Sequence, residues 1–215
     1  MELPPYTRGE EIFNMVSHIV GGAFGAAALV ICVVTAFMHD NIRGVIGGAV
    51  YGVSMITVYT ISSVYHGLKI NTAKKVMQVL DHCDIYFLIC GSYTPILLTG
   101  CYDYKPALCW SMLAAVWGVS AAGIVFKAID LHKYRVFTTA CYFIVGWSAV
   151  FVVKPMLNAF PLRFVIWIVT GGVIYTLGMI FFGLAKRYRY FHSIFHLFIL
   201  AGSVIQFFGI WFYCM

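Results

Sequence analysis

The sequence contains seven long runs without Asp, Glu, Lys or Arg, and these runs limit what the chain can fold into more than any other feature. A helix rises about 1.5 Å per residue, so about 20 apolar residues cross a hydrocarbon core of about 30 Å. The runs cover residues 14–38, 44–68, 85–102, 106–126, 136–153, 164–185 and 190–215. Membrane β-strands would be about ten residues long and would alternate polar with apolar side chains, which these runs do not do.

The composition supports a membrane protein and excludes the soluble classes. Of the 215 residues, 62% are hydrophobic and 10% are charged. In a soluble domain, about a quarter of the residues are charged. Seven cysteines, an odd number without a CxxC pair, exclude a secreted disulfide scaffold. We therefore predict an all-α integral membrane protein in which residues 1–215 form a single seven-helix domain. The predicted helices cover approximately residues 14–38, 44–68, 81–102, 106–126, 135–153, 163–185 and 190–213.

Lysine and arginine are distributed unequally between the two ends of these helices. One face receives Arg8, Lys69, Lys74, Lys75, Lys127, Lys133, Arg135, Lys186, Arg187 and Arg189. The other face receives Arg43, Lys105, Lys154 and Arg163. The positive-inside rule then predicts a cytoplasmic N-terminus and an extracytoplasmic C-terminus for a multi-pass protein of the plasma membrane. The net charge of +6 suits anionic lipid headgroups and requires no nucleic acid as a partner.

The ionisable side chains inside the runs and at their ends gather in one layer. An ionisable group in a spanning helix costs a few kcal/mol, so each one needs a partner or a function. With alternating helix directions, all of these residues fall near the cytoplasmic face. The ionisable residues of this layer are His18, His66, Asp81, His82, Asp84, His192 and His196, and the polar Ser62 and Ser63 lie in the same layer.

Spacing within this layer indicates a metal site. His192 and His196 are four residues apart, so they share one helix face, as when a helix gives two imidazoles to one metal. A third imidazole from His66 would leave a zinc ion with one open position for water, which is the layout of a catalytic site. Asp81 could hold that water or take its proton, and Ser62 lies one helical turn deeper than His66.

Simpler interpretations remain open for several of these residues. An HxxxH pattern alone recurs by chance, and a single helical histidine such as His18 is more often a packing or interfacial residue. The role of His82 is ambiguous. Asp84 is three residues from Asp81 and either shares its helix face or lies at the membrane interface.

At these positions the sequence resembles the hemolysin III family, the bacterial branch of the progestin and adiponectin receptor superfamily, which is similar to the alkaline ceramidases. The resemblance runs from about Glu10 to the C-terminus. The blocks that carry it are Glu10-Glu11-x2-Asn14-x3-His18, Ser54-Met55-Ile56, Ser62-x2-Tyr65-His66, Asp81-His82-Cys83-x-Ile85-Tyr86, Gly91-x-Tyr93-Thr94-Pro95, Gly171-Gly172-Val173-x-Tyr175 and His192-x3-His196.

The resemblance implies a seven-helix bundle with one zinc ion near the cytoplasmic face. It implies that His66, His192 and His196 are the ligands, and that Asp81 binds the metal directly or through its water. Ser62 would donate a hydrogen bond there. Glu11, Asn14 and His18 would support the site. Asp84 departs from the family pattern, where a neutral residue is expected, and would add a ligand or change the charge balance.

Three functions follow from this resemblance, and the first is our prediction. The chain would be a zinc-dependent hydrolase that cleaves an amide or ester bond of a membrane lipid. The alternative is a receptor-like or membrane-homeostasis protein in which zinc is structural. A hemolysin-like pore that causes cytolysis ranks third, because no helix carries a polar stripe along its whole length.

Overall fold

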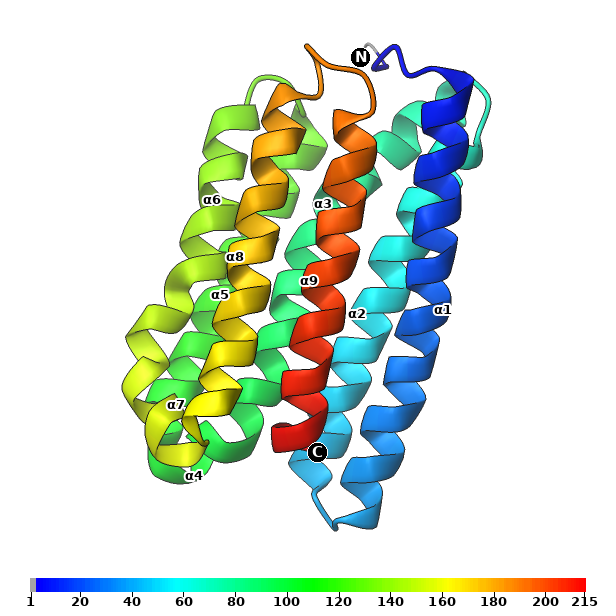
Figure 1. The fold of residues 1–215 in the computed structure, drawn as a ribbon. Coiled ribbons are helices and arrows are strands. Elements are labelled where there is room, and N and C mark those ends of the chain that lie inside the picture. The colour runs from blue at the N-terminus through cyan, green and yellow to red at the C-terminus, as the bar shows by residue number, and fades with distance from the viewer. Residues whose placement is uncertain (1–2) are drawn as a thin grey trace.

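The structure is a computed structural model that describes residues 3–215, and it is a bundle of seven long helical segments (Figure 1). The segments are α1 (Arg8–Met38), α2 (Ile42–Gly67), α3 with its continuation (Thr72–Tyr104), α5 (Pro106–Ile129), α6 with its continuation (Arg135–Ala159), α8 (Leu162–Leu184) and α9 (Phe191–Cys214). All seven are long and apolar enough to cross a membrane. The prediction of an all-helical protein with seven spanning helices is confirmed. The assignment of residues 1–215 to one domain stays a prediction.

Two of the seven segments change helix type along their length. In the third, α3 (Thr72–Ile96) passes through a wide turn, η1 (Leu97–Cys101), into the short α4 (Tyr102–Tyr104). Pro95 cannot donate a backbone hydrogen bond, which explains why the helix is distorted next to it. In the fifth, α6 (Arg135–Trp147) tightens in η2 (Ser148–Val152) before α7 (Val153–Ala159).

The first and third segments begin earlier than the sequence predicted. The first begins at Arg8 instead of residue 14, because Thr7 and Glu10 form a capping box. The third begins at Thr72 instead of residue 81, because Asn71 caps the helix there. The Asn71 side chain accepts a hydrogen bond from the backbone N–H of Lys74. These first turns carry charged residues, so a search for uncharged runs passes over them.

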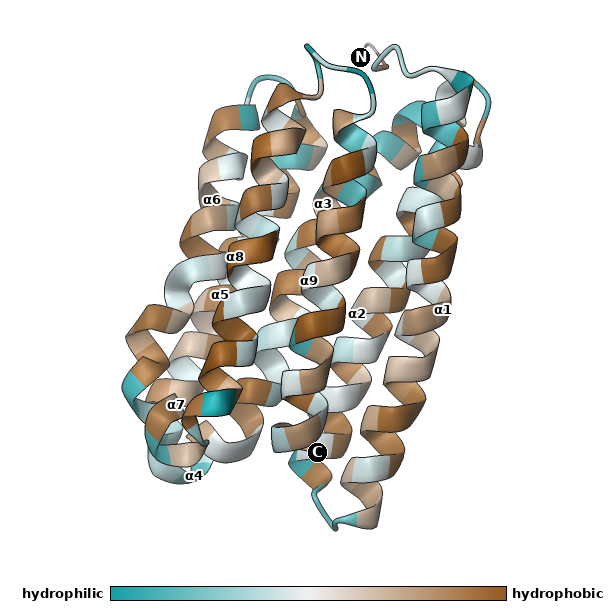
Figure 2. Cartoon of the chain, in the orientation of Figure 1, coloured by the Kyte–Doolittle hydropathy of each residue, from teal (hydrophilic) through white to brown (hydrophobic). Residues whose placement is uncertain are grey.

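Polar and apolar side chains are separated within the bundle. Large apolar side chains such as Val30, Phe37 and Ile144 are exposed on its outer surface, which suits contact with lipid. Hydrophilic residues gather at the ends of the helices, most densely at the end that holds the N-terminus and the start of α9 (Figure 2). We call this the site end, because α2 finishes there and α1, α3 and α9 begin there (Figure 1).

Glycines allow α1 and α2 to approach closely. A Cβ atom at Gly52 of α2 would lie 2.5 Å from the Cα and Cβ atoms of Leu29 on α1. At Gly118 on α5, a Cβ atom would meet nothing within 4 Å among the described residues. The two positions therefore provide a matched test of close helix packing.

We expect Gly52→Ala to lower the free energy of unfolding by about 1–3 kcal/mol, because the added methyl group forces the two helices apart. Gly118→Ala should be neutral or stabilising, since alanine favours a helix over glycine. Thermal unfolding of both variants in detergent measures the difference. Equal stability of the two variants would contradict the close packing of α1 on α2.

Candidate metal centre

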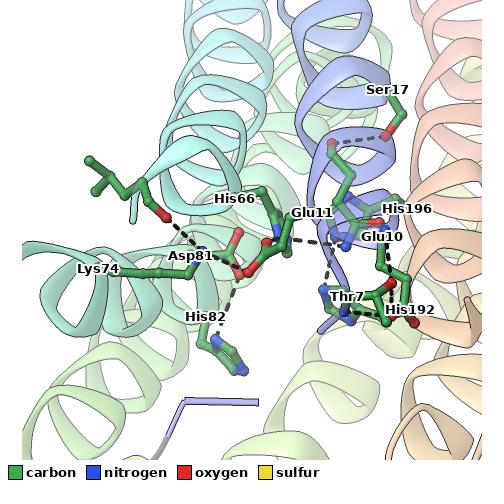
Figure 3. A network of polar contacts seen from close by, with 12 residues as sticks. Thr7, Glu10, Glu11, Ser17, His66, Lys74, Asp81, His82, His192 and His196 are labelled. Carbon is green, nitrogen blue, oxygen red and sulfur yellow. Dashed lines mark hydrogen bonds and ion pairs between the residues drawn. The ribbon is translucent and has the colours of Figure 1, made fainter. Parts of the chain in front are cut away.

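Three histidines from two antiparallel helices meet at the site end. His66 lies in the last turn of α2, and His192 and His196 lie in the first turns of α9. Each offers a ring nitrogen, and these three atoms lie within 4.8 Å of one another. The three residues are between 1% and 4% exposed, so bulk water does not solvate them. Figure 3 shows their side chains converging from the two helices.

The spacing of the ring nitrogens suits a metal ion. The Nε2 atoms of His192 and His196 are 3.0 Å apart, so they share either a proton or a cation. A tetrahedral ion with metal–nitrogen bonds of about 2.0–2.1 Å separates its ligand nitrogens by about 3.3 Å. The cluster of His66, His192 and His196 could therefore hold a metal ion.

A carboxylate from α1 fixes the orientation of the His66 ring. Glu11 Oε2 lies 2.6 Å from His66 Nδ1, and Glu11 Oε1 accepts a hydrogen bond of 2.7 Å from Lys74 Nζ. When Nδ1–H donates to Glu11, the lone pair of Nε2 is free to face the cluster. Among residues 3–215, His66 Nε2 has no hydrogen-bond partner. Carboxylates that hold metal-binding histidines in this way raise their basicity.

Two further α1 residues predicted from the sequence contact the cluster. The His18 ring stacks on His196 with its centroid 3.8 Å away and an interplanar angle of 21°. Asn14 Nδ2 lies 3.5 Å from His66 Nδ1. Both residues are buried, so α1 covers the histidines of α2 and of α9 with polar side chains.

A small cavity connects the histidines to α3. It has a volume of about 30 Å³, and its lining includes Ser62, Asp81 and His82 together with His18, His192 and His196. A cavity needs about 10–15 Å³ to hold a water molecule, so this one has room for water. Asp81 lies outside the group of three nitrogen ligands but faces the same space. Ser62 Oγ has no partner in the described part of the chain.

Asp84 and His82 differ in their positions relative to this cavity. The side chain of Asp84 is buried outside the cavity lining, and neither of its carboxylate oxygens has a partner among the described residues. His82 lines the cavity, and its Nδ1 atom lies 2.8 Å from the Gln78 carbonyl oxygen and 3.7 Å from Asp81 Oδ2. The structure thus brings Asp81 to the histidines and leaves Asp84 away from them.

A larger apolar cavity adjoins the small one. It has a volume of about 270 Å³ and lies between α3, α6, α8 and α9. Val58, Ile85 and Ile199 line both cavities, so the two spaces are neighbours. Val150 and Val169 also line the larger cavity and are exposed on the outside of the bundle. The larger cavity therefore extends from the histidine site to the lipid-facing surface.

Sequence reasoning assigned no role at this site to Tyr6, Glu10 or Lys74. The Tyr6 ring stacks on His192 with centroids 4.9 Å apart. Burial raises the pKa of Tyr6, and the neighbouring Tyr65, Asp81 and glutamates add to the shift, so its phenol stays protonated. The pattern Thr7-x-x-Glu10 was the signal that could have found Tyr6, because a capping box starts α1 at Arg8 and places Tyr6 at the site end.

The fold and the site together define a class: a multi-pass membrane protein of seven helices with a buried three-histidine cluster at one end. The sequence profile of the Haemolysin-III related family matches residues 6–207. The chain therefore belongs to this family, as the sequence motifs predicted.

Individual relatives extend the similarity over most of the chain. "Hemolysin-3" from Bacillus cereus is 35% identical over 96% of this chain and 92% of its own length. The "Monocyte to macrophage differentiation factor" of Homo sapiens is 29% identical over 76% of this chain and 68% of its own. The "Adiponectin receptor protein" of Drosophila melanogaster is 22% identical over 93% of this chain and 50% of its own length. No solved structure matches the chain significantly.

We expect Glu11→Gln to weaken metal binding by about 10- to 100-fold, because a neutral amide no longer supports the basicity of His66. Competition with a chelator for added Zn²⁺ measures the affinity. Asp103→Asn is the control, since Asp103 is an exposed carboxylate that pairs with Arg43 at the opposite end. Unchanged affinity in Glu11→Gln would show that the carboxylate does not support the metal.

Proposed function

We propose that this protein is a zinc-dependent hydrolase that cleaves an amide or ester bond of a membrane lipid. One observation carries the proposal: Asp81, Ser62 and two of the three clustered histidines, His192 and His196, line one small cavity that has room for water. This space adjoins an apolar cavity that reaches the lipid-facing surface. A structural metal site has no need of a carboxylate, a free hydroxyl and room for water beside it.

The residues present fit zinc, and His66, His192 and His196 would hold it. Neutral imidazoles are common zinc ligands, and three of them leave a fourth position free. Zinc bound there supplies an acidified water molecule, with a pKa of about 7, and polarises a carbonyl oxygen. Because Asp81 lies outside the nitrogen group, we assign it contact with the water and not with the ion.

Asp81 and Ser62 would then carry the proton transfer and the charge stabilisation. The carboxylate of Asp81 accepts a proton from the attacking water and returns it to the departing amine or alcohol. The Ser62 hydroxyl donates a hydrogen bond to the substrate carbonyl oxygen as negative charge develops on it. Ser62 lines the small cavity, where that carbonyl oxygen would lie.

The larger cavity would receive the hydrocarbon part of the lipid. Its lining is mainly apolar and includes Ile85, Leu88, Phe143 and Met179. A chain that enters between α6 and α8 would bring its carbonyl group toward the small cavity, where Val58 and Ile85 border both spaces. Membrane lipids are therefore the proposed partners, and amides and esters are the proposed bond types.

We propose that the site end faces the cytoplasm and that the protein lies in the plasma membrane. Ten of the fourteen Lys and Arg residues belong to segments at this end, and cytoplasmic loops carry the excess of positive charge. The N-terminus is then cytoplasmic and the C-terminus extracytoplasmic.

A second candidate is a structural metal in a receptor-like or membrane-homeostasis protein. The observation that favours it is that the three candidate ligands come from two helices, α2 and α9. A bound ion would join these helices near one end. A structural metal would make Asp81 dispensable for function, whereas a hydrolase requires it, so the effect of changing Asp81 distinguishes the two candidate functions.

We expect purified protein to contain about one zinc ion per chain, held by three histidines and an open position. The double variant His192→Ala/His196→Ala should contain little. Elemental analysis of both proteins measures the metal. The matched control is His39→Ala/His132→Ala, which removes two exposed histidines and should retain the ion. Equal zinc content in the two double variants would disprove the assigned ligands.

We expect Asp81→Asn to reduce lipid hydrolysis by about 10²- to 10⁴-fold, which is the usual contribution of a general base. The assay measures fatty acid released from N-acyl and O-acyl lipids in nanodiscs that contain the protein. Asp130→Asn is the control, because Asp130 is an exposed carboxylate outside the cavity lining. Absence of fatty acid release from every lipid by the zinc-loaded protein, or full activity in Asp81→Asn, would refute the proposal.

A further inference from the structure

The segment before α1 crosses the aqueous end of the histidine cluster. Tyr6 stacks on the ring of His192 with centroids 4.9 Å apart and an interplanar angle of 20°. The same ring lies 5.8 Å from the His66 ring, tilted by 51°. One aromatic side chain therefore covers two of the three candidate ligands from the side that the helices leave open.

The segment is held in place by a single buried carboxylate. Glu10 Oε2 accepts hydrogen bonds from the backbone N–H and the hydroxyl of Thr7, at 2.8 and 2.7 Å. Glu10 Oε1 accepts a hydrogen bond of 2.7 Å from the backbone N–H of Tyr190. Glu10 thus ties the segment to the turn between α8 and α9, directly before His192.

The hydrogen bonds that residues 3–7 make reach no further along the chain than Glu11, so the segment can open without breaking a hydrogen bond between helices. Residues 3–7 have no helical structure, and the backbone N–H of Tyr6 donates to the Pro4 carbonyl oxygen at 2.9 Å. Leu3, Pro4, Tyr6 and Thr7 are half-buried, and Pro5 is exposed. Segments with few buried contacts open at a lower free-energy cost than the helices they cover.

We propose that residues 3–7 form a lid over the histidine cluster and that Tyr6 is the side chain that closes it. The closed lid excludes water-soluble solutes from His66 and His192. The large cavity, which reaches the outside between α6 and α8, remains open to a lipid. The lid goes beyond the proposed function, because it would cover the histidines whether or not a bond is cleaved there.

The lid is tested by chemical modification of the histidines in the full-length, metal-free protein in detergent. Diethyl pyrocarbonate, which acylates accessible imidazoles, is added, and mass spectrometry follows the rate at each histidine. We expect Tyr6→Ala to raise the rate at His192 by about tenfold, which corresponds to about 1.4 kcal/mol. Tyr6→Phe should react at nearly the wild-type rate, since the ring and not the hydroxyl provides the cover.

Two exposed histidines in the same protein provide internal standards. His132 lies at the site end and His39 at the opposite end, and neither rate should change in any variant. Glu10→Gln should also raise the modification rate at His192, because it weakens the hydrogen bonds that Glu10 accepts from Thr7 and Tyr190. Asp40→Asn, an exposed carboxylate at the opposite end, is its control. Equal rates at His192 in the wild type and Tyr6→Ala would overturn the lid.

A second measurement separates the lid from the metal proposal. Zinc-loaded protein is mixed with a water-soluble chelator, and the rate of zinc release is compared between the wild type and Tyr6→Ala. The comparison is made at temperatures equally far below the unfolding midpoint of each protein. Faster release in Tyr6→Ala supports the lid. A wild-type protein that takes up no zinc refutes the proposed metal, while the modification rates still decide the lid.

Discussion

The carboxylate of Glu11 joins three helices, and the orientation of the histidine cluster depends on it. It contacts His66 of α2 and the ammonium group of Lys74 of α3, while Glu11 itself belongs to α1. Without this carboxylate, the buried Lys74 would lose its counter-charge and His66 could adopt either tautomer. Since an unpaired buried charge costs several kcal/mol, the three helices hold Glu11 and the site in one arrangement.

A second contact sets the height at which the histidines meet. Tyr59 donates a hydrogen bond of 2.6 Å to Ser203 Oγ, and Tyr175 lies 2.8 Å from the same oxygen. Tyr59 lies about two turns below His66 on α2, and Ser203 lies about two turns below His196 on α9. Because the helices are antiparallel, the register that joins Tyr59 to Ser203 also brings His66 to His196. A hydroxyl cluster within the bundle thus supports the geometry of the site at its end.

The sequence predicted the seven spans and the histidine cluster for different physical reasons. The spans follow from composition, since a membrane requires long uncharged helices, and HxxxH spacing places His192 and His196 on one face. The starts at Arg8 and Thr72 could not be found in this way, because charged first turns lie outside any uncharged run. For the same reason no role at the site was predicted for Tyr6, Glu10 or Lys74. The contact between Glu11 and His66 joins residues far apart in the chain, so no local pattern predicts which histidine the carboxylate supports.

Asp81 and Asp84 belong to the same helix, α3, but only the carboxylate of Asp81 faces the histidine site. They are three residues apart and nearly share a face, yet only Asp81 lines the cavity beside the histidines. The candidate ligands come from α2 and α9 alone, so the side toward α3 remains open and carries Asp81 and a space of about 30 Å³. Structural zinc sites are closed by a fourth protein ligand, whereas catalytic sites keep a position open for water. The opening toward α3, and not the histidines themselves, is therefore what favours chemistry over a structural clamp.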